Sequence, residues 1–225
     1  MAVGQAPAAG AGAAARCLIG ASARRRSAPQ WRIPVLIVGL VVFLGIHSVS
    51  IVAPGWRTAI IARFGEGPWK GLYSLASAVG IALIVVGFGI ARRSPVVLYT
   101  PPTMLRHLAL LVMLPVFPLF IAAYFPGRIK TAAKHPMLLS VKLWATAHLL
   151  ANGTLADVLL FGGFLAWAVV DRISVKRRTP QQQHAVPGAP PRPANDAIAL
   201  VGGLAVYAIL LLGGHRWLAG VSPLG

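Results

Sequence analysis

Six long apolar segments alternate with short polar stretches along this chain. Most of them approach the roughly 20 residues that a helix needs to cross a hydrocarbon core of about 30 Å. The predicted spans cover about residues 33–53, 71–91, 104–124, 137–152, 155–173 and 196–214. The pattern predicts an all-α, polytopic transmembrane helical bundle of about six spans. Five spans plus a re-entrant or interfacial segment is the alternative.

Proline and glycine mark breaks and kinks in these segments. Pro54-Gly55 ends the first span, and Asn152-Gly153-Thr154 breaks the chain between the fourth and fifth spans, which are expected to form a helical hairpin. Pro115 and Pro118 lie inside the third span and are expected to kink it, because proline removes a helical hydrogen bond and clashes with the preceding turn.

Small residues on the first two spans are expected to let the helix backbones approach closely, as small residues do at helix interfaces in membranes. They are Gly39, Gly45, Ser48 and Ser50 on the first span, and Ala78, Gly80 and Ala82 on the second.

Two stretches do not fit the helical pattern. Residues 1–31 are rich in Ala, Gly and Arg and contain no acid, so a disordered basic tail is expected there. The transmembrane domain then occupies residues 32–225. Within it, residues 175–195 are polar and rich in proline, which is typical of a mobile linker.

The composition narrows the class of function. With 57% hydrophobic and 11% charged residues, the chain is too apolar for a soluble domain. Its net charge of +17 is spread over termini and loops, which favours contact with lipid headgroups over nucleic-acid binding. The lone Cys17 in the tail excludes an internal disulfide and a thiolate metal site. The four acids exclude a carboxylate-rich catalytic centre; they are Glu66, Asp157, Asp171 and Asp196.

The histidines are the side chains best suited to bind a ligand, and they fall into two groups by their predicted depth in the membrane. His47 and His148 lie deep inside apolar spans, where an ionisable side chain normally faces a cofactor, a partner or a water-filled cavity. The others lie at span ends or in the linker, and an interfacial role is expected for His215; these four are His107, His135, His184 and His215.

His47 and His148 are predicted at compatible depths. By the helix rise, His47 lies roughly 10 Å from the end of its span and His148 roughly 16 Å from the start of its own, and these two ends face the same side of the membrane. Two such imidazoles can clamp a haem iron, or each can hydrogen-bond to neighbouring spans. Trp144 and Asn152 share a helix face with His148 and are candidates for flanking such a ligand, although Asn152 also suits a helix cap.

Three stretches give the chain a family resemblance. LGIHSVSIVAPGWR, KHPMLLSVKLWATAHLLANG and LLFGGFLAWAVVDR resemble the NnrU family of bacterial integral membrane proteins, and the resemblance covers about residues 33–224. That family is named for an association with nitric oxide metabolism and denitrification. The resemblance implies a multi-pass protein of the bacterial inner membrane.

The same pattern is more distantly similar to 15-cis-zeta-carotene isomerase, a membrane enzyme that carries haem b with histidine axial ligands. The similarity implies that His47 and His148 are haem ligands. The isomerase family has a cysteine three residues before the second histidine, where this chain has Ala145. This departure argues against isomerase chemistry and leaves bis-histidine haem binding intact.

Three functional hypotheses follow. The first is a haem b protein, with His47 and His148 on the iron, that serves redox or nitric-oxide metabolism with a redox partner. The second is a haem-dependent cis-trans isomerase of a carotenoid-like polyene. The third is a membrane assembly factor without a cofactor.

Overall fold

The computed structural model describes residues 32–178 and 188–224, which belong to one unit, residues 31–225. The predicted tail, residues 1–31, and the middle of the predicted linker lie outside the described residues. The described part is helical, with a single isolated bridge between Val97 and Thr154 and no strand. The all-α prediction is confirmed.

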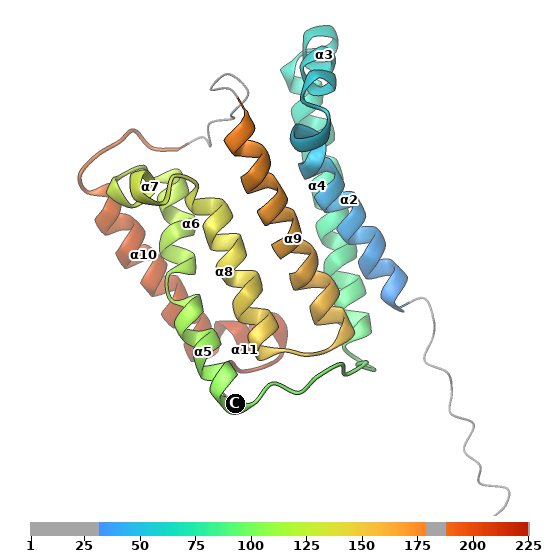
Figure 1. Ribbon diagram of the computed structural model, residues 1–225, viewed down its shortest axis with the longest axis vertical. Coiled ribbons are helices and arrows are strands. Elements are labelled where there is room, and N and C mark those ends of the chain that lie inside the picture. The colour runs from blue at the N-terminus through green and yellow to red at the C-terminus, as the bar shows by residue number, and fades with distance from the viewer. Residues whose placement is uncertain (1–31, 179–187, 225) are drawn as a thin grey trace, which may run out of the picture. The chain divides into compact units, whose positions relative to one another are not determined.

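The first two spans form a closely packed helical pair (Figure 1). α2 is Arg32–Val52 and α4 is Glu66–Ala91, joined by α3, Pro54–Phe64. α4 begins five residues before the predicted span, because Glu66 in its first turn complements the helix dipole and pairs with Lys70 at 3.2 Å. The connecting helix α3 was not expected from the hydrophobic pattern.

The third span is broken where proline predicted a kink. α5, Thr103–Met113, ends before Leu114-Pro115, and α6, Val116–Tyr124, continues beyond it. A short helix, α7, Arg128–Ala133, then leads to the fourth span.

The fourth and fifth spans form the predicted hairpin. α8 is Pro136–Ala151 and starts with proline in its first turn, where a missing N–H costs nothing. α9 is Leu155–Arg177 and begins with a capping box between Thr154 and Asp157. At 16 residues α8 is only about 24 Å long, shorter than the hydrocarbon core, whereas five other helical segments are long and apolar enough to cross it.

α9 extends two residues past the predicted start of the linker at residue 175. α9 continues to Arg177 because Val175 is buried against Leu138 and Ala168, and because Arg178 pairs with Asp171 at 2.7 Å. Burying this last turn stabilises helical backbone that the polar sequence alone does not favour.

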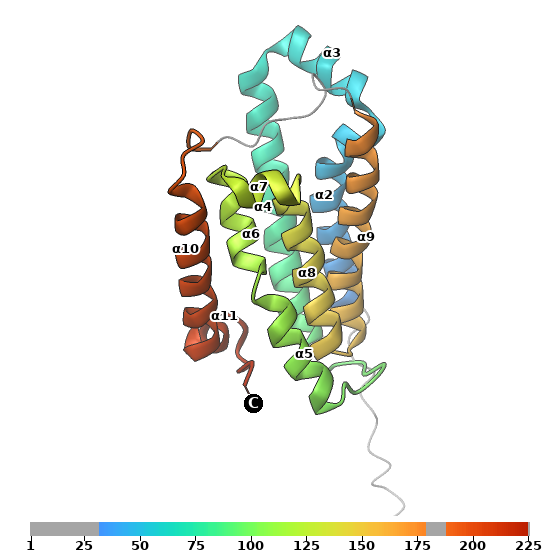
Figure 2. The ribbon, with the colours of Figure 1, turned by 60° about the vertical axis from the view of Figure 1, so that its left-hand side comes forward.

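The last span is redirected near its end. α10, Asn195–Ile209, is followed by a kinked turn, Leu210–Gly214, whose backbone is non-helical at Gly213. α11, His215–Ala219, follows and ends at Gly220, whose φ of 71° is a left-handed cap. Figure 2 shows α10 beside α6 and α9 beside α2.

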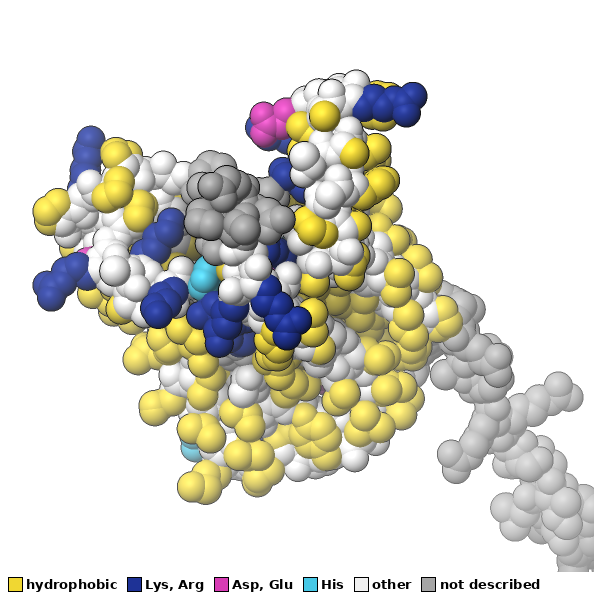
Figure 3. All heavy atoms as spheres, turned by 45° about the horizontal axis from the view of Figure 1, so that its top comes forward, with side chains coloured by type: hydrophobic (Ala, Val, Ile, Leu, Met, Phe, Trp, Pro, Cys, Tyr) yellow, Lys and Arg dark blue, Asp and Glu magenta, His cyan; other side chains and the backbone are white. Residues whose placement is uncertain are grey.

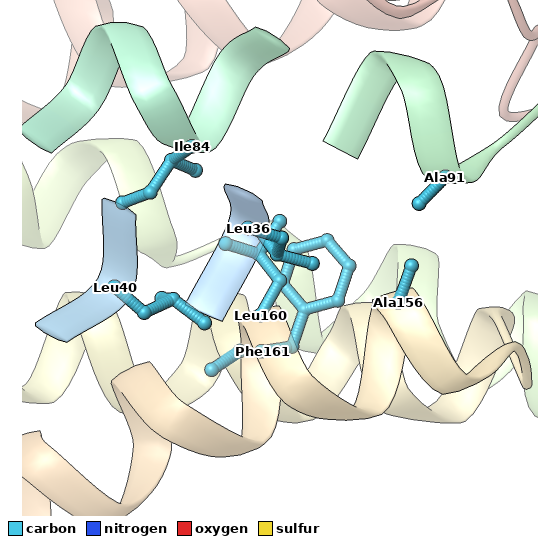
Figure 4. Close-up of a cluster of buried hydrophobic side chains, with 8 residues drawn as sticks. Leu36, Leu40, Ile84, Ala91, Ala156, Leu160 and Phe161 are labelled. Carbon is cyan, nitrogen blue, oxygen red and sulfur yellow. The ribbon is translucent and has the colours of Figure 1, made fainter. Parts of the chain in front are cut away.

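The core lies where α2, α4, α8 and α9 meet, and Figure 4 shows most of it as sticks. Its buried members are Leu36, Leu40, Ile84, Ala91, Ala145, Ala156, Leu160 and Phe161. Large apolar side chains cover the outside as well: Val41 is 66% and Val85 is 66% exposed. A helix bundle that is apolar on its outer surface requires a lipid surrounding, so the chain is a multi-pass membrane protein.

Basic side chains mark one end of the bundle. Figure 3 shows Lys and Arg around the end that carries α7, above an apolar belt. We call this the α7 end; it holds the start of α8 and the C-terminus of α9. The opposite end holds the start of α5, the C-terminus of α8 and α11, and we call it the α11 end.

Small residues bring α2 and α4 together, in part as predicted. A Cβ added at Gly39 would lie 2.6 Å from the backbone nitrogen of Ile84, and one at Gly80 would lie 2.8 Å from that of Phe43. Gly45 faces open space instead. Gly87, which the sequence analysis did not single out, makes the tightest approach of this interface: its added Cβ would lie 2.5 Å from the nitrogen of Leu36.

Candidate functional site

A cavity of about 520 Å³ opens near the α11 end, between α5, α8 and the C-terminal segment. Its volume lies in the range of about 300–1,000 Å³ that small-molecule and cofactor sites occupy. Apolar side chains form most of the wall, with a small set of polar groups among them. These are Thr103, Arg106 and His107 from α5, His148 and Asn152 at the end of α8, Tyr207 from α10, His215 from α11 and Ser222 beyond it.

His148 is half-buried in the last turn of α8, and its ring is held on two sides. It lies 4.4 Å from the Phe161 ring of α9, centre to centre, in a stacked arrangement. Its Nδ1 lies 2.8 Å from the carbonyl oxygen of Trp144. Because a carbonyl only accepts hydrogen bonds, Nδ1 carries the proton and Nε2 keeps a free lone pair. An imidazole oriented in this way is ready to bind a metal ion.

The two residues predicted to flank His148 both contact it. The Trp144 ring lies 5.2 Å from that of His148 and also packs edge-on against Phe161 and Phe164. Asn152 is the C-cap of α8, and its side-chain amide donates to the carbonyl of His148 at 3.0 Å. Trp144 therefore orients the ring of His148, and Asn152 hydrogen-bonds to the His148 backbone at the end of the helix.

His215 also lines the cavity, near His148. Their ring centres lie 6.3 Å apart with an angle of 30° between the rings. Nδ1 of His215 lies 2.8 Å from the carbonyl oxygen of Val221, so Nδ1 is the donor and Nε2 is the nitrogen left for a ligand. The sequence analysis placed His215 at the interface. The available signal was Gly213-Gly214 directly before it, a pair that can redirect a helix.

His47 lies in a different cluster, among aromatic rings of α2, α4 and α9. Its ring stacks on Phe43 at 4.2 Å, lies 5.0 Å from Tyr73 and meets Trp167 edge-on at 6.1 Å. Its Nδ1 lies 2.7 Å from the carbonyl oxygen of Phe43. The indole nitrogen of Trp167 is buried, with no hydrogen-bond partner among residues 32–178 and 188–224.

The structure gives His47 and His148 different neighbours on α9. His148 packs on Phe161, whereas His47 packs on Trp167, six residues further along the helix. Six residues correspond to about 9 Å along the axis and about 120° around it. The His47 side chain does not line the cavity, which lies on the side of α5 and α11.

The cavity also carries positive charge at its edge. Arg106 and His107 are exposed on the first turns of α5 and line the opening. Tyr207 donates from its hydroxyl to the carbonyl of Leu110 at 3.0 Å and so ties α10 to α5. The described residues hold no cluster of three or more His, Cys, Asp or Glu side chains suited to a metal ion.

His135 lies at the other end of the bundle, as the N-cap residue of α8. Burial lowers its pKa, and the positive charges of Arg172 and Lys134 lower it further, against an opposing effect of Asp171. This histidine is thus remote from the cavity.

Comparison with known proteins identifies the family. Searches of curated proteins and of solved structures give no significant match. A family model described as NnrU protein matches residues 35–223, which includes every described helix that lines the cavity. The chain belongs to the NnrU protein family.

Proposed function

We propose that this protein binds one haem b in the cavity at the α11 end, with His148 on the iron. The observation that carries the proposal is the His148 imidazole: it lines a cavity of about 520 Å³ with Nδ1 held by a carbonyl and Nε2 free. Metal-bound histidines characteristically donate their second ring nitrogen in this way.

The residues around the cavity fit the remaining parts of such a group. Apolar walls suit a flat macrocycle, and the Trp144 and Phe161 rings fix the imidazole that would bind its iron. Arg106, at the exposed edge, supplies a guanidinium for the carboxylates of haem, a pairing that planar geometry favours. When bound, haem supplies a one-electron carrier, or a site for a diatomic gas if a coordination position is open.

The family and the cavity together suggest a role in redox metabolism linked to nitric oxide, in the bacterial inner membrane. Electron transfer is the form of this role that two protein imidazoles favour, because they leave no open position for a gas. The sequence resemblance offers His47 as the second imidazole, and the cavity offers His215.

The alternative of polyene isomerisation is less well supported. Ala145 replaces the cysteine of the isomerase family, and this residue is fully buried in the core and does not line the cavity. A dark co-expression with a cis-polyene pathway tests this alternative: formation of the trans product would favour it over electron transfer.

The experiment on haem binding uses the full chain, expressed in a bacterial host with added haem precursor and purified in detergent. We expect a Soret band and the pyridine haemochrome spectrum of haem b. His148→Gly should lose or alter the band, and added imidazole should restore it. His135→Gly, at the α7 end, is the matched control and should leave the spectrum unchanged.

Two results would refute the proposal. One is a wild-type protein without a Soret band despite ample haem, which would favour a cofactor-free assembly factor. The other is a His148→Gly variant that binds haem with the wild-type spectrum.

A further inference from the structure

We infer that His215, on the C-terminal helix α11, is the second imidazole of the His148 site; this rests on the proposed haem binding. The inference starts from a distance. An imidazole nitrogen binds a transition metal at about 2 Å, and with about 1 Å from each nitrogen to its ring centre, two imidazoles across one ion have centres about 6 Å apart. The rings of His148 and His215 are 6.3 Å apart.

The hydrogen bonds of the two rings are matched. Each donates from Nδ1 to a backbone carbonyl at 2.8 Å, His148 to Trp144 and His215 to Val221. Each therefore leaves Nε2 as the nitrogen that can bind a ligand, and no hydrogen bond of either Nε2 is seen among the described residues. Both rings line the cavity, and a metal ion between them would bind a nitrogen of each.

The backbone around His215 keeps this residue at the cavity. The kinked turn Leu210–Gly214 breaks the direction of α10. Gly220 then ends α11 with left-handed backbone, and Arg92 donates to the carbonyl of Ala219 at 2.5 Å. These contacts tie the short helix to the end of α4 and fix its place at the cavity.

His47 has the same Nδ1 hydrogen bond, to the carbonyl of Phe43 at 2.7 Å, but it lies outside the cavity. Its ring contacts Tyr73 and Trp167 and does not line the cavity, so its nitrogen faces a different group of residues. This separation turns His47 into the control for the experiment, since the sequence resemblance and the structure assign the second ligand differently.

The test compares His215→Ala and His47→Ala in the full-length, haem-loaded protein. The readouts are the electron paramagnetic resonance spectrum, the near-infrared magnetic circular dichroism band of bis-imidazole iron, and the optical response of the reduced protein to carbon monoxide. Wild type and His47→Ala should be low-spin and insensitive to carbon monoxide. His215→Ala should become high-spin and bind the gas.

Rescue variants keep the test decisive if the alanine variant folds poorly. His215→Gly should regain the low-spin spectrum with added imidazole, and His215→Met should stay low-spin with a higher reduction potential. A low-spin, gas-insensitive His215→Ala protein would overturn the inference, most directly if His47→Ala is the high-spin variant. Haem-free wild-type protein would instead refute the proposed function, so the two failures are distinct.

Discussion

The tight contact between α2 and α4 at Gly87 makes a sharp prediction about stability. Replacing Gly87 by alanine adds a Cβ that would lie 2.5 Å from the backbone nitrogen of Leu36 and 2.7 Å from its Cα. Ordinary contact begins at 3.4 Å, so the two backbones would have to separate by about 0.9 Å. Backbone atoms on both sides leave no flexible side chain to move aside.

The magnitude follows from two opposing effects. Overpacking that shifts backbone costs about 1–3 kcal/mol, whereas glycine to alanine in a helix gains about 1 kcal/mol in propensity. Gly89, two residues further along α4, is the matched control, because a Cβ there meets no atom within 4 Å. The propensity gain cancels between the two variants. Gly87→Ala should therefore be less stable than Gly89→Ala by about 1–3 kcal/mol.

The assay is unfolding in mixed micelles titrated with sodium dodecyl sulfate and followed by tryptophan fluorescence. Purified wild type, Gly87→Ala and Gly89→Ala are compared at equal protein and lipid content. Equal stability of the two variants would refute the reasoning that close backbone approach at Gly87 holds the α2–α4 pair together.

Further predictions concern hydrogen bonds and pH. Ser140→Ala removes a buried hydroxyl that donates to the Val116 carbonyl at 2.9 Å and joins α8 to α6; the same titration should show a loss of about 1 kcal/mol, and no loss would contradict this role. Thr154→Val removes the hydroxyl of the capping box with Asp157 and should cost about 1 kcal/mol, with restoration by Thr154→Ser as the check. The lowered pKa of His135 gives stability that is full above about pH 6.5 and is lost as the pH falls below that value, because the unfolded chain then binds the proton first. Between pH 7 and 5 the melting temperature should fall less in His135→Asn than in wild type. An equal fall in both proteins would show that His135 does not cause the pH dependence.

Much of the fold was predictable from local properties of the chain. The apolar segments marked the helices, because a span must match the thickness of the hydrocarbon core. Pro115 marked the break between α5 and α6, and Thr154 with Asp157 began α9, since proline and capping residues act on adjacent backbone. The short α8 and the extension of α9 to Arg177 were less visible, because they depend on what each helix packs against.

The candidate site was predictable only in part. The spacing of His148 from Trp144 and Asn152 follows from one helix. The structure shows Trp144 against the imidazole and Asn152 hydrogen-bonded to the backbone carbonyl of His148. The proximity of His215 to His148 could not be predicted from one helix in this way. Counting residues along separate spans predicted comparable depths for His47 and His148. Depth, however, does not specify which faces of the helices meet.

The sequence by itself determined that this chain is a helical membrane protein of the NnrU family with a histidine, His148, in its fourth apolar segment. Only the tertiary structure decided that α11 returns to the end of α8 and brings His215 within 6.3 Å of His148. The physical reason is the distance along the chain over which each interaction acts. Hydrophobic length and helix capping act over a few adjacent residues, whereas the meeting of residues 148 and 215 depends on how α5, α8 and α10 pack and on the redirection of the chain at Gly213.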